Sequence, residues 1–237
     1  LYANPGTPKT AKIMMPFEIL DGAMGSELIK RGLILPEHIW SADINMNYPE
    51  LVLQIHGEYV GAGADYITTN TFRTTPRAYL KTGINSKKAS QMAKYSLVQA
   101  IELAKNTALE RIKIIGSIAP LEDCYRPDLF PGRDVAISEF SQQGKWMAEM
   151  GVDILLLETM NSMEEIEAGL CALKNTNLPL WVSFVLKDKS HLLSGDRLDD
   201  TLNMLNNFQI EMVLLNCNPL IRTKKAVDNI VDNWNER

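Results

Sequence analysis

The sequence predicts an α/β protein of the (β/α)8 TIM-barrel class, with about six β/α units present. Short, nearly continuous apolar runs alternate with longer amphipathic segments, as in parallel sheets that are covered by helices. The apolar runs end in polar residues, and the carboxyl ends of barrel strands gather on one catalytic face. An open doubly wound sheet shares the alternation, but no G-x-G-x-x-G motif follows a strand here. The barrel is therefore the favoured architecture.

Six apolar runs are the expected strands, each short and rich in Ile, Val, Leu or Thr. A closed barrel of this class takes roughly 250 residues. We therefore expect residues 15–237 to form a barrel that is incomplete at its C-terminus, and residues 1–14 to be a leader or expression remnant outside it. The expected strands are FEILDG (17–22), DYITTN (65–70), KIIGSIA (113–119), DILLLET (153–159), LWVSFVL (180–186) and MVLLNC (212–217).

Amphipathic segments between these runs are the expected helices. Ser162, followed three residues later by Glu165, has the pattern of a helix capping box. The long first connection is expected to hold two helices that are separated by a break at Pro36. The expected helices are 25–31, a second one through LVLQIHGEYVGAG (51–63), then 86–106, 135–151, 162–175, 199–207 and 222–234.

Composition excludes several classes of function. The net charge of -5 and the absence of a dense Lys/Arg run argue against nucleic-acid binding. No apolar stretch approaches the roughly 18–20 residues that a membrane-spanning helix needs. The three cysteines are few and odd in number, which does not fit a disulfide framework and favours a reducing compartment. We therefore expect a cytoplasmic protein without nucleic-acid or membrane partners.

Cys217 is the most informative thiol, because it ends an apolar run and is flanked by Asn216 and Asn218. An isolated cysteine is commonly a small buried hydrophobe. At the tip of a barrel strand, however, a thiol can serve as a zinc ligand or a nucleophile. Cys124, in a loop, and Cys171, on an apolar helix stripe, are weaker ligand candidates.

Polar residues at the other strand tips are the remaining site candidates. Glu158 follows a buried apolar run, and a carboxylate in that position needs a cationic partner or a substrate ammonium group. Asp21 and Gly22 open DGAMGSEL, where backbone N–H groups could approach a ligand closely. Asn70 and Thr71, in TTNTF, offer an amide and a hydroxyl at another tip.

Taken together and in order, these stretches resemble the homocysteine S-methyltransferase family. The resemblance extends over nearly the whole chain after Met15 and implies a (β/α)8 barrel. It is carried by LDGAMGSEL (20–28), HIWSADINMNYPELVLQIHGEYVGAGADYITTNTF (38–72), IGSIAP (115–120), DILLLETM (153–160), SFVLKDKSHLLSGD (183–196) and LLNCNP (214–219).

The resemblance implies methyl transfer from a small activated donor to homocysteine, as in methionine biosynthesis. Family members bind zinc through three cysteines, of which Cys217 matches the first; the other two form an adjacent pair, and no Cys-Cys pair occurs in this sequence. Glu158 would take the homocysteine ammonium group, with Asp21, Gly22, Asn70 and Thr71 lining the same pocket. The methyl donor stays open, although HIWSAD (38–43) looks most like the S-methylmethionine group.

Two other interpretations stay open. The chain could be a zinc-less, non-catalytic barrel that retains an amino-acid pocket around Glu158, or a barrel of different activity that uses Cys217 without a metal. A six-unit barrel would also leave a sheet edge exposed, so self-association is expected.

Overall fold

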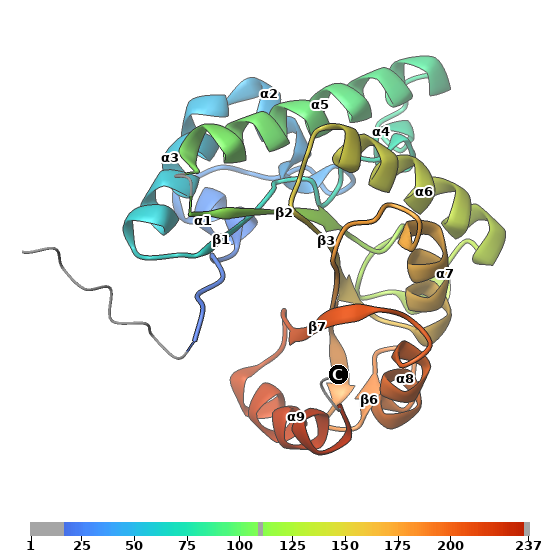
Figure 1. Cartoon of the computed structure of the whole chain (residues 1–237). Coiled ribbons are helices and arrows are strands. Elements are labelled where there is room, and N and C mark those ends of the chain that lie inside the picture. Colours follow the sequence, from blue (N-terminus) through green and yellow to red (C-terminus); the bar gives the residue numbers. More distant parts are fainter. Residues whose placement is uncertain (1–16, 109–110, 235–237) are drawn as a thin grey trace, which may run out of the picture.

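The computed structural model describes residues 17–108 and 111–234. Its centre is a curved parallel sheet of five strands in the order β1-β2-β3-β4-β7 (Figure 1). The predicted α/β alternation and parallel sheet are thereby confirmed. The strands are β1 (Tyr66–Thr68), β2 (Lys113–Ile118), β3 (Ile154–Met160), β4 (Leu180–Phe184) and β7 (Ile210–Leu215), and β5 (Leu186–Asp188) and β6 (His191–Leu192) form a separate antiparallel pair.

Helices connect the strands and cover the outer side of the sheet (Figure 1). All the predicted helices are present, with bounds shifted by a few residues. They are α1 (Met24–Lys30), α3 (Pro49–Gly61), α5 (Ser86–Thr107), α6 (Arg133–Glu149), α7 (Met163–Leu173), α8 (Leu198–Leu205) and α9 (Leu220–Asn233). The sequence did not predict four short helices, η1 (Trp40–Asp43), α2 (Ile44–Asn47), α4 (Pro76–Leu80) and η2 (Pro127–Leu129).

The helix start at Ser162 has half of the predicted capping box. The Ser162 hydroxyl accepts a hydrogen bond from the backbone N–H of Glu165 at 3.4 Å. The Glu165 side chain does not reach back to Ser162; it accepts from the backbone N–H of Leu121 at 2.8 Å instead. This buried carboxylate therefore ties α7 to the loop after β2.

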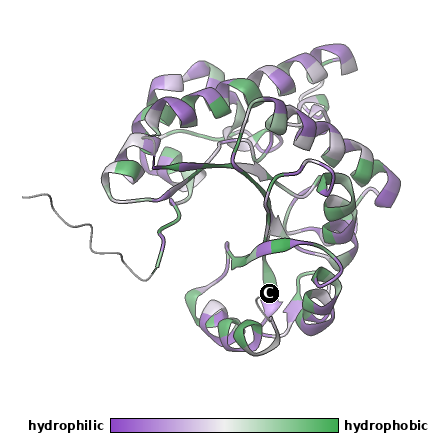
Figure 2. Ribbon diagram, viewed as in Figure 1, coloured by the Kyte–Doolittle hydropathy of each residue, from purple (hydrophilic) through white to green (hydrophobic). Residues whose placement is uncertain are grey.

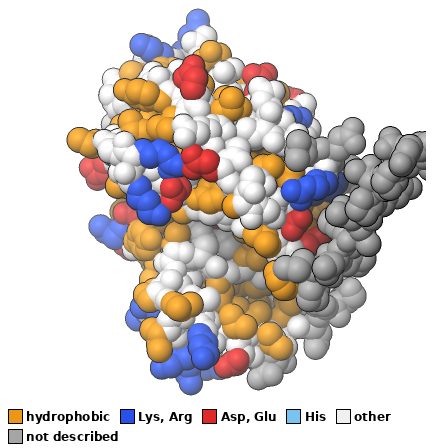
Figure 3. Space-filling view, turned by 90° about the vertical axis from the view of Figure 1, so that its left-hand side faces the viewer, with side chains coloured by type: hydrophobic (Ala, Val, Ile, Leu, Met, Phe, Trp, Pro, Cys, Tyr) orange, Lys and Arg blue, Asp and Glu red, His pale blue; other side chains and the backbone are white. Residues whose placement is uncertain are grey.

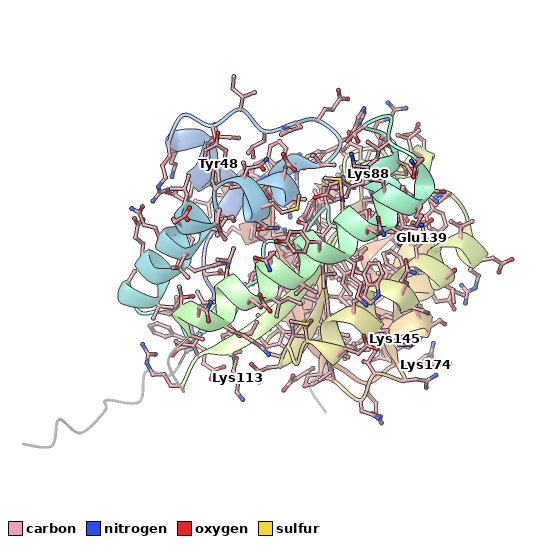
Figure 4. The ribbon with its side chains drawn as sticks, turned by 90° about the horizontal axis from the view of Figure 1, so that it is seen from above. Tyr48, Lys88, Lys113, Glu139, Lys145 and Lys174 are labelled. Carbon is pink, nitrogen blue, oxygen red and sulfur yellow. The ribbon has the colours of Figure 1, made fainter. Side chains whose placement is uncertain are left out.

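Successive side chains of each strand point to opposite faces of the sheet and so form two apolar layers. On the helix side, Leu155 and Leu157 of β3 join the large core beneath α5, α6 and α7. On the other side, Ile154, Leu156 and Trp181 belong to a smaller inner cluster. The ribbon coloured by hydropathy shows green and purple alternating along the outer helices (Figure 2). From above, exposed Lys88 of α5 and Lys145 of α6 lie on the outer surface (Figure 4).

The predicted strand 17–22 is only partly formed. Leu20 makes a single parallel bridge to Tyr66, and the neighbouring Asp65 N–H donates to the carbonyl of Ile19 at 2.7 Å. The segment thus lies beside β1 without forming a regular strand, so the prediction of six strands is corrected to five plus one bridge.

The predicted strand 180–186 ends early, at Phe184. The side chain of Asn218 accepts from the backbone N–H of Leu186 at 2.8 Å and donates to the carbonyl of Phe184 at 2.9 Å. These bonds replace strand pairing, and the chain continues into the β5–β6 hairpin. Nothing in the local apolar pattern indicates this, because the capping amide lies 32 residues further on.

Among the described strands, β7 has a neighbour on one side only. It pairs with β4 from Leu180↔Ile210 to Phe184↔Leu215, and no described strand pairs with its other edge. The described residues therefore form an open, curved sheet. Closure of the barrel, the predicted incompleteness at the C-terminus and self-association stay predictions.

Candidate functional site

A cleft of about 870 Å³ opens at the carboxyl ends of the sheet strands. The space-filling view shows a hollowed face with hydrophobic side chains around the hollow (Figure 3). Residues from distant parts of the sequence meet here because parallel strands bring their carboxyl ends to one side. The strand-tip residues that line it are Asp21, Gly22, Thr68, Asn70, Glu158, Thr159, Ser183, Asn216 and Cys217.

Glu158 reaches the cleft through the two-residue period of β3. Leu156 belongs to the inner apolar cluster, and Glu158 follows it on the same face of the strand. The Ser117 hydroxyl donates to Oε2 of Glu158, and Nδ2 of Asn216 donates to Oε1 at 3.3 Å. Burial raises the pKa of Glu158, against the opposing effect of the Ser117 bond. No described Lys, Arg or His forms an ion pair with this carboxylate.

Asp21 is the second carboxylate of the cleft. Its oxygens accept from the backbone N–H of Thr68 at 2.9 Å and from the Thr68 hydroxyl at 2.8 Å. Burial, with a further contribution from the negative charge of Glu158, raises the pKa of Asp21 to about 7, although the Thr68 bonds act the other way. Two carboxyl groups that disfavour each other's ionisation form a site that a cation would stabilise.

Gly22 lines the cleft, but packing explains its lack of a side chain. A Cβ atom at this position would lie 2.5 Å from the Tyr59 hydroxyl oxygen. The glycine therefore lets the Tyr59 ring pack beneath the loop that carries Asp21. Direct contact of the Gly22 backbone with a ligand stays a prediction.

Asn70 and Thr71 have structural contacts that the sequence did not indicate. The Asn70 amide donates to the carbonyl of Ser41 at 3.0 Å and to Oδ1 of Asn45 at 2.8 Å, and its oxygen accepts from the Ser41 hydroxyl. Thr71 is fully buried, is absent from the cleft lining and donates to the carbonyl of Ser117 at 2.7 Å. The expectation that Thr71 lines the pocket is thus corrected, because its hydroxyl joins the loop after β1 to strand β2.

Cys217 lies in the same cleft as Glu158. It follows β7 with φ +52°, and its thiol is exposed to the cleft. Burial of part of the side chain, then the negative charge of Glu158, raises the pKa of the thiol; contacts with Thr159 and Tyr125 oppose this. The predicted thiol and the predicted carboxylate thus line the same cleft.

A second left-handed residue, Thr159, lies at the tip of β3 with φ +62°. This conformation is unfavourable for a β-branched residue and requires support from its surroundings. The Thr159 N–H donates to the Ser183 hydroxyl at 3.0 Å, and its own hydroxyl accepts from Nδ2 of Asn216 at 2.7 Å. Hydrogen bonds to the tips of β4 and β7 therefore hold Thr159, next to Glu158, in this conformation.

The described residues do not fit a complete zinc centre. A catalytic zinc site takes three protein ligands, and no group of three or more His, Cys, Asp or Glu residues suited to a metal occurs in the described part of the chain. Cys124 also lines the cleft, and burial raises the pKa of its thiol to about 12. Cys217 offers a single thiol ligand.

Several cleft residues escaped the sequence-based prediction of the site. Asn216 lines the cleft, and Ser117 is fully buried and holds Glu158 without lining the cleft. Both residues stand at predicted strand tips, but their bonds to Glu158 could not be predicted from the sequence. Tyr125 and Arg73 come from loops without a periodic pattern. Arg73 directly follows TTNTF, and that adjacency is the one signal by which it could have been found.

The chain is similar to known proteins over nearly its whole length. The family model described as homocysteine S-methyltransferase matches residues 18–236. Homocysteine S-methyltransferase YbgG of Bacillus subtilis is 31% identical over 234 residues, which cover 92% of this chain and 74% of the relative. Homocysteine S-methyltransferase of Escherichia coli is 30% identical over 227 residues, which cover 90% of this chain and 73% of the relative.

A solved structure shares the architecture. The metallated form of the homocysteine methyltransferase MmuM from Escherichia coli superposes with a TM-score of 0.83 at 27% identity, covering 93% of this chain and 81% of that one. Among the described residues, no helix is both long enough and apolar enough to cross a membrane.

Proposed function

This chain belongs to the homocysteine S-methyltransferase family, and we propose that its cleft transfers a methyl group from an activated donor to the sulfur of homocysteine, giving methionine. The observation that carries the proposal is the half-buried carboxylate Glu158, which has no cationic partner among the described residues and lies in one cleft with Asp21 and Cys217. Such a site suits a substrate that brings its own ammonium group.

The carboxylates orient the substrate. The ammonium group of homocysteine binds between Glu158 and Asp21, and its positive charge favours the ionised form of both. Ser117 and Asn216 hold the Glu158 carboxylate from two sides, so the acceptor geometry is preorganised. With the ammonium group bound there, the thiol of homocysteine extends toward the tip of β7 and Cys217.

At the methyl carbon, the reaction breaks one bond and forms one. The sulfur of homocysteine attacks the donor methyl carbon, a carbon–sulfur bond forms, and the bond from that carbon to the positively charged donor atom breaks as the electron pair returns to the donor. The homocysteine proton is lost to solvent. A free thiol has a pKa of about 8.5 and is mostly protonated at neutral pH, so the reaction benefits from any group that favours the thiolate.

Zinc is the group that the family resemblance implies. When bound, zinc would favour the thiolate of homocysteine by coordinating its sulfur. We propose Cys217 as the ligand that this chain contributes. Because the described residues offer no complete ligand set, the same observation favours a second candidate function, a zinc-less barrel that binds amino acids through Glu158 without catalysis.

The proposed donor is S-methylmethionine, a sulfonium compound. Residues of the HIWSAD segment, His38, Trp40 and Ser41, line the cleft, which supports a role for this segment in binding the donor. The aromatic ring of Trp40 suits a sulfonium cation, because a ring face attracts positive charge.

Methionine formation from homocysteine and S-methylmethionine tests the proposal. We expect Glu158→Gln to raise the KM for homocysteine by about 10- to 100-fold, the range for losing a charge-assisted hydrogen bond. Glu122→Gln is the matched control, because Glu122 lines the same cleft but is paired with Arg77 and Lys81. Equal effects of the two changes would contradict the role of Glu158.

Zinc content separates the two candidate functions. Zinc that copurifies with the wild-type chain, is lost in Cys217→Ser and persists in Cys171→Ser would support Cys217 as a ligand. Zinc that is unaffected by Cys217→Ser would contradict it. Homocysteine binding without zinc and without turnover would favour the non-catalytic barrel.

A further inference from the structure

We propose that Arg73 binds the carboxylate of an amino-acid substrate in the cleft; this inference rests on the proposed function and adds the residue that recognises the acidic end of the substrate. Arg73 lies in the loop after β1 and lines the cleft. Its guanidinium carbon is 5.3 Å from the centroid of the Phe72 ring, and Nη1 donates to the carbonyl of Pro120 at 3.0 Å.

Most of the donors of Arg73 stay available. A guanidinium carries five N–H donors in a planar fork that matches a carboxylate, and one of these groups bonds to the carbonyl of Pro120. The contacts with Pro120 and Phe72 fix the plane of the guanidinium group. The rest of the fork is therefore preorganised for a ligand, and no other described group accepts a hydrogen bond from it.

Arg73 differs in this respect from the other Lys and Arg residues of the cleft. Lys81 pairs with Glu122, and Arg126 pairs with Asp128 at 2.7 Å. In the described part of the chain, no carboxylate forms an ion pair with Arg73. Of the three cations that line the cleft, Arg73 is the one whose charge no described carboxylate balances through direct contact.

The carboxylates nearest to Arg73 are committed elsewhere. Glu122 binds Arg77 and Lys81, Asp123 accepts from the backbone N–H of Tyr125 at 2.9 Å, and Glu165 accepts from the backbone N–H of Leu121 at 2.8 Å. Burial lowers the pKa of Arg73, while these negative groups and Cys124 oppose that effect. An arginine stays charged under such a shift, and a partly desolvated charge of this kind gains most from an ionic ligand.

The cleft thus holds groups for both ends of an amino acid. Glu158 and Asp21 supply negative charge for an ammonium group, and Arg73 supplies positive charge for a carboxylate. Homocysteine and S-methylmethionine both carry an α-carboxylate that Arg73 could bind. Experiment decides which of the two substrates supplies it.

Binding measurements with compounds that lack the carboxylate test the inference. Calorimetry would compare homocysteine with 3-aminopropane-1-thiol, and S-methylmethionine with (3-aminopropyl)dimethylsulfonium, on wild type, Arg73→Gln and Arg126→Gln. We expect Arg73→Gln to weaken binding of one or both carboxylate compounds by about 10- to 100-fold and to leave their decarboxylated analogues within about threefold. Arg126→Gln, at an ion-paired cation of the same cleft, should change none of the four affinities substantially.

The two pairs of compounds identify the source of the carboxylate. A selective loss confined to the homocysteine pair assigns Arg73 to the acceptor, and one confined to the sulfonium pair assigns it to the donor. If Arg73→Gln weakens each compound and its analogue equally, or weakens none, Arg73 does not bind the carboxylate, while homocysteine binding by the wild-type chain would leave the proposed function intact. A wild-type chain that binds none of the four compounds would overturn both proposals. Thermal melts of each variant identify any loss of folding.

Discussion

Strands β3 and β7 have similar apolar sequences but very different surroundings. β3 lies between β2 and β4 and beneath α7, and almost all its side chains are buried. β7 pairs only with β4 among the described strands, and its Met212 is 37% exposed. The chemistry at their tips differs accordingly: Glu158 is held by hydrogen bonds from two other strand tips, whereas the Cys217 thiol is open to the cleft.

Position in the sheet, more than composition, decides how firmly each of these functional groups is held. The carboxylate that binds substrate in our proposal is on the strand with neighbours on both sides. The thiol that we propose as a metal ligand is on the strand with one neighbour. Asn216 joins the two tips, because its amide reaches Glu158, Thr159 and Ser183.

The largest expected difference between the two strands is in the free energy of unfolding. Leu157 of β3 is 1% exposed, so Leu157→Ala should cost about 2–5 kcal/mol by losing buried contacts and leaving a cavity. Met212→Ala on β7 should cost less than about 1 kcal/mol, because much of that side chain is already in contact with water. Urea unfolding of both variants measures this, and similar costs would show that β7 is as well covered as β3.

A smaller effect is expected where the two strand tips are joined. Asn216→Ala removes the bonds to Glu158, Thr159 and Ser183, so we expect a loss of about 1–3 kcal/mol in the free energy of unfolding and a raised KM for homocysteine. Asn203→Ala, at an exposed position of α8, serves as the control. An Asn216→Ala variant with unchanged stability and KM would show that the tips are held independently.

The smallest effect concerns the pH dependence of stability at the β1 end of the sheet, opposite β7. Folded Asp21 keeps its proton up to a pKa of about 7, against an ordinary value of 3.8. Between these values the folded chain binds more protons than the unfolded chain, so this group makes the folded state less stable as pH rises from about 4 to about 7.

Asp21→Asn should remove that contribution. The loss of stability between pH 5 and pH 8 is expected to be smaller in the variant by about 1 kcal/mol, a figure reduced for partial solvent exposure. Glu158, whose pKa burial also raises, leaves part of the slope in place. Identical pH profiles of wild type and variant, measured by urea unfolding, would show that Asp21 ionises normally in the folded chain.

The local pattern of the sequence determined most of the secondary structure and the positions of two site residues, Glu158 and Cys217. Apolar runs and amphipathic segments depend on neighbouring residues, so five strands and the long helices could be located from the order of residues alone. Glu158 and Cys217 could be predicted together because parallel strands necessarily bring their carboxyl ends to one side. The capping serine Ser162 is likewise a local signal, and it caps α7 as expected.

Only the tertiary structure decided the features that depend on contacts between distant residues. Thr71 turns away from the cleft because its hydroxyl finds the carbonyl of Ser117, and β4 ends early because Asn218 binds its end. The left-handed backbone at Thr159, and the position of Arg73 where no described carboxylate forms an ion pair with it, likewise depend on which groups surround them. The periodicity of a segment indicates which face of a helix or strand is apolar. Hydrogen bonds and ion pairs, however, depend on which residues from elsewhere in the chain lie opposite that face. Only the folded structure brings those residues together.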